Sequence, residues 1–278
     1  MPALTSAFQL SGGILLDDDC ISLYRDLVLT GQALEDRTVS ARHELHPLAA
    51  KAIANLASEP VRAKTWIDGM LGSGMTESNV LEVIRFVNQI GGLVVRRGLR
   101  STLDMAVRQI TLAKLGGRGT ARVYRAPAGV RGIASAVGRA SAPLFATAPV
   151  TLSLANVAHV ISLQQTELAV AVLVTLLLSM VAHELGHVLT IKHFRCDACV
   201  IQRGLRLGII HRKMKRREEL MTSLMGPMVG AVSCLAMTAV FHMNGFAEFG
   251  LAAAILHLLS LLPWYGDGRA LFNNLMKS

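Results

Sequence analysis

Cysteine is scarce in this chain, with four residues among 278. A small protein held together by a disulfide framework is therefore excluded, because such proteins are short and dense in cysteine. A basic segment followed by a long apolar core is also missing from the start of the chain, where Asp17, Asp18 and Asp19 interrupt the sequence. This start does not have the pattern of a secretory signal. We therefore expect the first part of the chain to stay in the cytoplasm.

Acidic residues are in the minority: 19 Asp and Glu stand against 28 Lys and Arg, and the formal net charge is +9. Such an excess fits either nucleic acid or an anionic membrane surface. The placement of the basic residues favours the membrane and speaks against a nucleic-acid partner, because they flank long apolar stretches. One cluster precedes the first such stretch and consists of Arg96, Arg97, Arg100, Arg108, Lys114, Arg118, Arg122, Arg125, Arg131 and Arg139. The other follows the second stretch and consists of Arg195, Arg203, Arg206, Arg212, Lys213, Lys215, Arg216 and Arg217.

Charges are spread through the first hundred residues, and long apolar stretches begin after Arg139, so we expect two domains. A helix that crosses a bilayer needs about 20 mostly apolar residues. Four stretches meet or approach this length, at about 140–164, 168–190, 220–242 and 247–266. The first and last of them also fit re-entrant or surface-lying segments. With both basic clusters on the cytoplasmic side, the four stretches alternate in direction across the membrane.

The second apolar stretch contains a motif of metal-dependent hydrolases. The letters VAHELGH at 181–187 extend a stretch, 168–182, that has no charged residue. On a helix, His183 and His187 lie on one face and can bind one Zn²⁺, with Glu184 placed to act as the base for an attacking water. Ionisable side chains inside a membrane are costly and are functional by default. The alternative is that both histidines only pack against neighbouring helices.

A catalytic zinc ion usually has three protein ligands and one open position. Asp267 is the best candidate for the third ligand, because it is the only carboxylate after Glu248 and glycines flank it. At the inner end of the fourth stretch it lies at a depth similar to that of the two histidines. Two alternatives stay open: Gly-Asp-Gly is common turn chemistry, and His257 competes as a ligand. We expect one Zn²⁺ per chain.

The half of the chain from Ala140 onward resembles the site-2 protease family of intramembrane zinc metalloproteases. The resemblance depends on the His-Glu-x-x-His motif, a Gly-Pro on the following apolar stretch and an Asp-Gly on the last one. It implies that Glu184 is the catalytic base and that the zinc ligands are His183, His187 and Asp267. It also implies that the residues shaping a substrate cleft are Gly226, Pro227, Pro263 and Gly268.

The last motif departs from the family pattern. The family commonly has an Asn where this chain has Ser260, and the interval between Pro263 and Asp267 is one residue shorter than usual. This removes a polar group that the family has near the scissile bond, and it weakens the assignment of Asp267.

Cys196 and Cys199 form a single Cys-x-x-Cys pair in the basic segment after the zinc motif. Without a second pair, such a motif does not complete a four-ligand zinc site and is usually incidental. Because His193 precedes the pair by three residues, a small auxiliary metal site is the alternative.

The segment between His46 and Gly98 has the pattern of three helices followed by a hairpin. Pro47 suits a first helical position, and Thr76 can cap the third helix. Apolar residues recur at helical spacing, and they are Leu48, Ile53 and Leu56, then Trp66, Ile67 and Met70, then Val80, Val83, Ile84 and Val87. The segment 91–95 reads as a short strand that enters a wing.

This winged-helix pattern resembles the PqqD-like peptide-recognition domain of ribosomal-peptide maturation systems. The resemblance implies that the domain binds a leader peptide by adding it as a strand to a sheet edge. The alternative is an ordinary small domain without a ligand.

The expected fold is therefore mainly α, with a small winged-helix domain at 1–98, a basic linker or membrane-surface segment at 99–139 and a four-span helical membrane domain at 140–278. We expect an integral protein of a bacterial-type cytoplasmic membrane, in contact with the lipid bilayer, whose N-terminal domain and active-site end face the cytoplasm. Its oligomeric state stays open.

These expectations combine into one functional hypothesis, a membrane-embedded zinc endopeptidase that cuts a peptide precursor presented by its N-terminal domain. An alternative substrate is a membrane-anchored regulator that the cut releases. A third alternative is a membrane-tethered winged-helix regulator that binds DNA and has no protease activity. Contact with DNA phosphates needs basic residues on the third helix, but the residues there, Glu77, Glu82, Arg85 and Asn88, are mixed in charge. A peptide carrier or exporter would not need Glu184 between two histidines.

Overall fold

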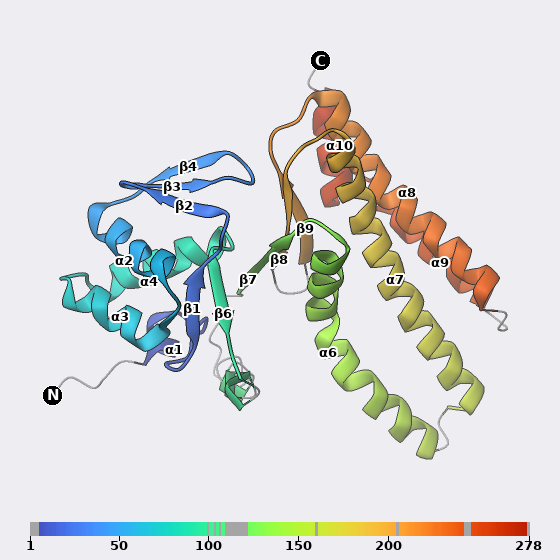
Figure 1. Cartoon of the computed structure of the whole chain (residues 1–278). Coiled ribbons are helices and arrows are strands. Elements are labelled where there is room, and N and C mark those ends of the chain that lie inside the picture. The colour runs from blue at the N-terminus through green and yellow to red at the C-terminus, as the bar shows by residue number, and fades with distance from the viewer. Residues whose placement is uncertain are drawn as a thin grey trace. The chain divides into compact units, whose positions relative to one another are not determined.

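The computed structural model describes residues 6–98, 100–102, 104–105, 107–108, 122–158, 161–203, 206–241 and 246–276, without the side chains of 143–147, 149 and 150. The chain forms two compact units, Met1–Arg125 and Ala126–Ser278 (Figure 1). Helices predominate and the sheets are small, which confirms the mainly α expectation.

The first unit begins with strands and continues with helices. Its early elements are α1 (Ala7–Leu10), β1 (Cys20–Leu23), β2 (Leu27–Thr30), β3 (Ala33–Asp36) and β4 (Ala41–Glu44). Its later elements are α2 (Pro47–Ser58), β5 (Val61–Arg62), α3 (Ala63–Gly72), α4 (Glu77–Gln89) and β6 (Leu93–Arg96). They make two three-stranded sheets, in the orders β5-β1-β6 and β2-β3-β4.

The three predicted helices of the first unit are α2, α3 and α4, and they lie where the sequence places them. Pro47 occupies the start of α2, and the Thr76 hydroxyl caps α4 by accepting from the Asn79 backbone N–H. The predicted apolar faces form the core, and Trp66 anchors α3 to α2 by donating from Nε1 to the Ala52 carbonyl at 2.8 Å. Helical spacing of apolar residues was therefore a sufficient signal for this part of the fold.

The strand of the predicted hairpin exists, but its partner is different. β6 pairs antiparallel with β1, which precedes all three helices, so that Leu23 lies opposite Leu93 and Cys20 opposite Arg96. Strands β2, β3 and β4 form a separate antiparallel meander ahead of the helices, with the turn after β2 at Gly31, whose φ is 63°. Four-residue strands are too short to show clear alternation, which explains why the sequence pattern did not reveal them.

Two arginines of the predicted lipid-facing cluster are instead neutralised inside the first unit. The Arg97 guanidinium donates to both carboxylate oxygens of Asp19 at 2.6 Å. The Arg125 guanidinium makes a two-pronged pair with Asp36 at 2.7 and 2.8 Å, and both side chains are buried. The assignment of these two residues to a membrane-facing surface was therefore wrong, because their carboxylate partners lie 78 and 89 residues away in the chain.

The second unit consists of long helices and one three-stranded sheet. Its elements are β7 (Val123–Pro127), which contains the boundary between the units, α6 (Val130–Val157), α7 (Leu163–His193), β8 (Ala198–Arg203), β9 (Arg206–His211), α8 (Arg216–Val240), α9 (Phe246–Leu259) and α10 (Gly266–Met276). Helices α7, α8 and α9 pack against one another, and α10 packs on α8 (Figure 1). The basic segment after the His-Glu-x-x-His motif contains an antiparallel hairpin, β8 with β9, in a sheet ordered β7-β8-β9.

Two described helices have the length and composition to cross a membrane, α7 with 31 residues and α8 with 25. They correspond to the second and third predicted spans. The fourth predicted span, 247–266, is not one helix: α9 has 14 residues, about 21 Å at 1.5 Å per residue, and turns separate it from α10. The first, 140–164, is not among the two candidates; α6 begins at Val130 and ends at Val157. Four complete spans are therefore not found in the described part of the chain.

The predicted linker, 99–139, is only partly described. Residues 109–121 lie outside the described residues, whereas 122–139 form β7 and the first turns of α6. Ile133, Ala136 and Val137 of α6 are buried against Val188 of α7 and Val200 of β8. This end of the predicted linker is thus part of the core of the second unit.

Candidate metal centre

His183 and His187 lie one helical turn apart in the last third of α7. A capping box at Ser162 and Gln165 starts this helix, and the uncharged, mostly apolar residues 168–182 continue it to the motif. The Nε2 atoms of the two imidazoles are 3.2 Å apart. The helical spacing therefore places both nitrogens at one point, as the motif predicts.

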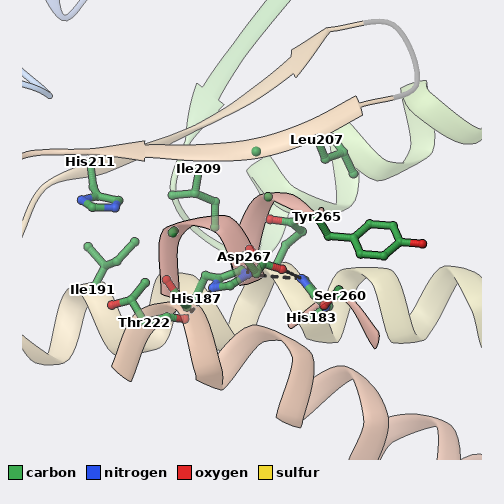
Figure 2. A pocket seen from close by; sticks show the side chains of 15 residues that line it. His183, His187, Ile191, Leu207, Ile209, His211, Thr222, Ser260, Tyr265 and Asp267 are labelled. Carbon is green, nitrogen blue, oxygen red and sulfur yellow. Dashed lines mark hydrogen bonds and ion pairs between the residues drawn. The ribbon is translucent and has the colours of Figure 1, made fainter. Parts of the chain in front are cut away.

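Asp267 joins them from the first turn of α10. Its Oδ2 lies 3.1 Å from His183 Nε2, and its Oδ1 lies 3.3 Å from His187 Nε2 (Figure 2). Gly268 brings this turn close to the end of α9, because its N–H donates to the Ser260 carbonyl at 3.0 Å and an added Cβ would collide with the Leu262 carbonyl oxygen. The glycine after Asp267 is thus required for the close approach.

α8 fixes the orientation of His187. The His187 Nδ1 lies 2.7 Å from the Thr222 carbonyl oxygen, and a carbonyl can only accept, so Nδ1 carries the proton and Nε2 keeps its lone pair. Two glycines allow this contact. An added Cβ on Gly186 would lie 2.7 Å from the Met225 carbonyl oxygen, and one on Gly226 would overlap the His187 ring.

The spacing of the donor atoms tests whether a zinc ion fits. Among the described residues, His183, His187 and Asp267 form the one group of three or more potential ligands whose donor atoms all lie within 4.8 Å of one another. In a tetrahedral site with bonds of about 2.0–2.1 Å, neighbouring ligand atoms are roughly 3.3 Å apart. The two imidazole nitrogens, 3.2 Å apart, have this spacing, and each lies 3.1 or 3.3 Å from a different oxygen of the Asp267 carboxylate. Two imidazole nitrogens and one carboxylate are a donor set that zinc accepts, and they leave a fourth position open.

His183, His187 and Asp267, called the metal group below, line one cavity of about 490 Å³ together with Glu184. Strand β9 runs along this cavity and contributes Leu207, Ile209 and His211, and Tyr265 lies on the side of Leu207, away from His211 (Figure 2). Thr222, Ser223 and Ser260 add hydroxyl groups to the lining. A carboxylate that is not part of the metal group thus faces the same space as the metal group, which is the arrangement a general base needs.

The four residues predicted to shape a substrate cleft have other contacts. None of them is among the residues that line this cavity, which Ser260 and Tyr265 border instead. Gly226 makes room for the His187 ring and Gly268 packs on the end of α9. Pro227 is buried inside α8, and Pro263 lies exposed in the turns that follow α9.

His257 is not a member of the metal group. Its ring lies against the His183 ring, with centroids 5.2 Å apart, and its Nδ1 is 3.2 Å from His183 Nδ1, the nitrogen that does not face Asp267. In this structure Asp267, rather than His257, is the third potential ligand.

The cysteine pair does not join a described metal cluster. Cys199 is buried on β8, and Cys196 donates to the Arg212 carbonyl at 3.4 Å. Burial raises the pKa of the Cys196 thiol, which disfavours the thiolate that a zinc ligand must be. Neither cysteine is grouped with His193 among the described potential ligands.

Sequence reasoning missed the contribution of Thr222, Tyr265 and strand β9 to the site. A hairpin signal was available for β9, because β-branched pairs at Val200-Ile201 and Ile209-Ile210 flank a glycine in the segment read as a loop. The contribution of Thr222 is a backbone carbonyl, and no side-chain pattern reports it.

Comparison of the chain with protein-family models, curated proteins and solved structures finds no match. The functional argument therefore depends on the residues and geometry described above.

Proposed function

We propose that this chain is a membrane-embedded zinc endopeptidase of the site-2 protease type, whose first unit presents a peptide substrate. The observation that carries the proposal is the convergence of His183 Nε2, His187 Nε2 and Asp267 at 3.1–3.3 Å beside Glu184. Two imidazole nitrogens that both face one carboxylate, beside a further glutamate, form the ligand set of a zinc site with a general base next to it.

The chemistry follows from the roles that the side chains can take. Zn²⁺ held by His183, His187 and Asp267 would supply a Lewis acid for water activation and carbonyl polarisation. Glu184 is close enough to these three residues to interact electrostatically with them. As a carboxylate at the cavity wall it takes a proton from the attacking water and returns it to the leaving amine. The products are a carboxylate and an amine, so one water is consumed for each bond cut.

The substrate must be extended at the cut. A peptide carbonyl inside a helix is hydrogen-bonded and enclosed, whereas an extended strand exposes it. β9 is at the edge of the sheet ordered β7-β8-β9 and lines the cavity, so its backbone can pair with such a strand. The apolar lining from Leu207 and Ile209 favours apolar residues next to the scissile bond.

A bilayer is the environment that best accounts for the surfaces of α7 and α8. Only 17% of the most apolar window of α7 is buried, and 33% of that of α8, whereas the core helix of a water-soluble protein is mostly buried. Large apolar side chains are exposed along these helices, and they include Val170, Leu178, Leu189, Met228, Val232 and Leu235. A lipid surface removes this area from water without a protein partner.

The first unit contains a groove that fits an extended peptide. Its volume is about 450 Å³, and it lies between helix α4 and the start of α2, with Glu44 at the end of β4, an edge strand of the β2-β3-β4 sheet. Leu45, Met75 and Phe86 are among its apolar lining residues, and Glu44 and Glu82 lie at its border. We expect an added strand with apolar anchors and a basic residue near Glu82, since its carboxylate attracts positive charge, whereas Glu44 already pairs with Arg42 at 2.8 Å. This arrangement supports the PqqD-like reading of the unit.

The exposed surface of α4 does not favour a nucleic-acid-binding regulator. Its exposed charged residues are Glu77, Glu82 and Arg85, so this face carries a net negative charge. Binding to phosphates depends on clustered Lys and Arg.

Release of a membrane-anchored regulator uses the same active site and differs from peptide maturation only in the substrate.

Metal analysis combined with a cleavage assay tests the proposal. The wild type, His183→Ala and Glu184→Gln are purified in detergent, their zinc content is measured, and they are incubated with fluorescent casein, an unstructured polypeptide. We expect about one zinc per chain in the wild type and in Glu184→Gln, and none in His183→Ala. Cleavage should be found only in the wild type, because Glu184→Gln keeps the metal group and loses the base. Cleavage at the wild-type rate by Glu184→Gln would show that the assigned base is wrong.

The groove of the first unit is tested with two substitutions on one helix. Ala49 lines the groove, and Ala57 lies on the exposed surface of α2. Ala49→Arg fills the groove, whereas Ala57→Arg adds the same charge elsewhere. In a display selection of peptides with alternating apolar residues and lysines, the full-length wild type and Ala57→Arg should retain the same peptides and Ala49→Arg should lose them. Equal retention by both variants contradicts the groove as the binding site.

A further inference from the structure

His257 is an ionisable side chain on the most apolar helix of the second unit. It lies near the end of α9, where its neighbours in the sequence are leucines and alanines. Its ring packs between helices, with the His183 ring of α7 at a centroid distance of 5.2 Å. Such a group is costly in an apolar environment unless it has hydrogen-bond partners that give it a task.

Both ring nitrogens of His257 have partners on α7. The His257 Nε2 lies 3.0 Å from the Ser179 Oγ, and the His257 Nδ1 lies 3.2 Å from the His183 Nδ1. Ser179 donates its hydroxyl proton to the Leu176 carbonyl at 2.9 Å. Because that proton is used, the Ser179 oxygen is left to accept, and its donor is the His257 Nε2–H.

The direction of this first bond determines the next one. A neutral imidazole that donates from Nε2 has its lone pair on Nδ1. The His257 Nδ1 therefore accepts from the Nδ1–H of His183. That leaves the lone pair of His183 on Nε2, the atom that lies 3.1 Å from Asp267 Oδ2 and faces the metal group. The hydrogen bonds thus run in one direction, from His183 to His257, to Ser179 and to the Leu176 carbonyl.

We propose that His257, oriented by Ser179, is a positioning residue that holds His183 in the tautomer and ring orientation a metal ligand requires. The inference depends on the proposed metal centre and adds to it a residue that touches neither the metal nor the substrate. His257 does for His183 what the Thr222 carbonyl does for His187 at 2.7 Å. Partners of this kind, on the nitrogen that does not bind the metal, fix the ring and raise ligand basicity.

Two glycines on α8 provide the room for the two imidazoles. Gly226 lies against the ring of His187, and Gly230, one turn later, lies against the ring of His257. A Cβ added to Gly230 would be 2.6 Å from the His257 Nδ1. This spacing of four residues on one helix face indicates that His257 is packed as tightly as a ligand.

His257 does not fit the role of an alternative ligand in this arrangement. Its Nδ1 and Nε2 are both engaged by α7, and neither faces Asp267. A ligand role requires the ring to leave Ser179 and His183, whereas a positioning role requires it to stay. The two roles predict different metal stoichiometries, which makes them separable.

The experiment compares His257→Leu, which removes both nitrogens at similar size, with His257→Asn, whose side-chain oxygen can replace Nδ1 as the acceptor. Ser179→Ala removes the second partner with little loss of volume. His193→Gln changes an exposed histidine at the end of α7 and serves as the control. The full-length proteins are stripped of metal in detergent. Zinc affinity and stoichiometry are measured by competition with a chromophoric chelator, and the visible spectrum is recorded after cobalt replaces zinc.

We expect His257→Leu to bind one zinc per chain with an affinity about 10- to 100-fold lower than that of the wild type. The cobalt spectrum of His257→Leu should differ from that of the wild type. Ser179→Ala should show the same spectral change with a smaller loss of zinc affinity. His257→Asn should lose less than about tenfold in zinc affinity, and His193→Gln should equal the wild type. If His257→Leu does not fold, Ser179→Ala and His257→Asn still report on the same bonds.

Three results overturn the inference in distinguishable ways. Wild-type affinity in both His257→Leu and Ser179→Ala removes the positioning role and leaves the metal centre intact. Loss of all zinc from His257→Leu, equal to that in His183→Ala, makes His257 a ligand instead. A wild-type protein that takes up no metal refutes the proposed function itself, and the positioning role with it.

Discussion

Replacing Gly226 by Ala is the smallest change that we expect to disable the metal centre. The new Cβ would overlap the His187 ring. The ring has little freedom to withdraw, because it is 7% exposed and its Nδ1 is bonded to the Thr222 carbonyl at 2.7 Å. Thr222 and Gly226 lie one turn apart on α8, so a movement of this helix that relieves the overlap also changes the bond that orients the ring.

The size of the effect follows from the cost of overpacking. Forcing one extra carbon into a packed site costs about 1–3 kcal/mol. When the ring moves to avoid this cost, its Nε2 leaves the position 3.2 Å from His183 Nε2. The metal-bound state holds the ring in place and therefore carries this strain of about 1–3 kcal/mol. Because about 1.4 kcal/mol corresponds to a factor of ten, zinc affinity should fall by about 5- to 150-fold.

The assay is zinc competition with a chromophoric chelator, alongside the thermal unfolding midpoint of the metal-free protein. Gly138→Ala on α6 is the matched control, because nothing lies within 4 Å of its added Cβ. That variant should keep the wild-type affinity and gain up to about 1 kcal/mol of helix stability. Zinc affinity of Gly226→Ala within about twofold of the wild type would refute the reasoning.

Three further predictions concern other parts of the chain. Asp36→Ala should lower the free energy of unfolding of the first unit by about 3–5 kcal/mol, because it removes the carboxylate that neutralises the buried Arg125 guanidinium. Glu44→Ala, which breaks the exposed pair with Arg42, should cost less than about 1 kcal/mol. Equal losses in urea unfolding would contradict this contrast. A chelator should abolish casein cleavage, and added Zn²⁺ should restore it. Ca²⁺ should not, because two of the three ligands are imidazoles, which bind zinc, whereas calcium prefers oxygen ligands. Restoration by Ca²⁺ alone would contradict the zinc assignment. Gly230→Ala should weaken zinc binding in the wild type, because the added Cβ displaces His257, but it should have little further effect when His257→Leu is already present. Additive losses of zinc affinity in the double variant would contradict an effect that acts through His257.

The sequence was sufficient for the local features of the site. His183, Glu184 and His187 belong to one helix, and helical spacing alone places the two imidazoles together, as the structure confirms. Asp267 was predicted from its isolation among apolar residues, and its placement by α10 agrees with that prediction. The helices of the first unit were likewise predicted from apolar spacing and from caps such as Thr76.

Features that depend on contacts between distant segments were not predictable in the same way. The pairing of Arg125 with Asp36 spans 89 residues, whereas the position of Arg125 before the first apolar stretch assigned it to a lipid-facing cluster. The role of His257 depends on its ring facing His183 and Ser179 across a helix interface, which no one-dimensional pattern encodes. α9 ends at Leu259, so the apolar stretch that continues to Gly266 had the composition of a span without its secondary structure.

The most direct test of the central claim is X-ray absorption at the zinc edge of the purified, full-length protein. The account predicts a four-coordinate ion with light-atom neighbours at about 2.0 Å and the outer-shell scattering of two imidazoles. Zinc surrounded by sulfur at about 2.3 Å would place the metal at Cys196 and Cys199 instead, and the assignment of His183, His187 and Asp267 would then be contradicted.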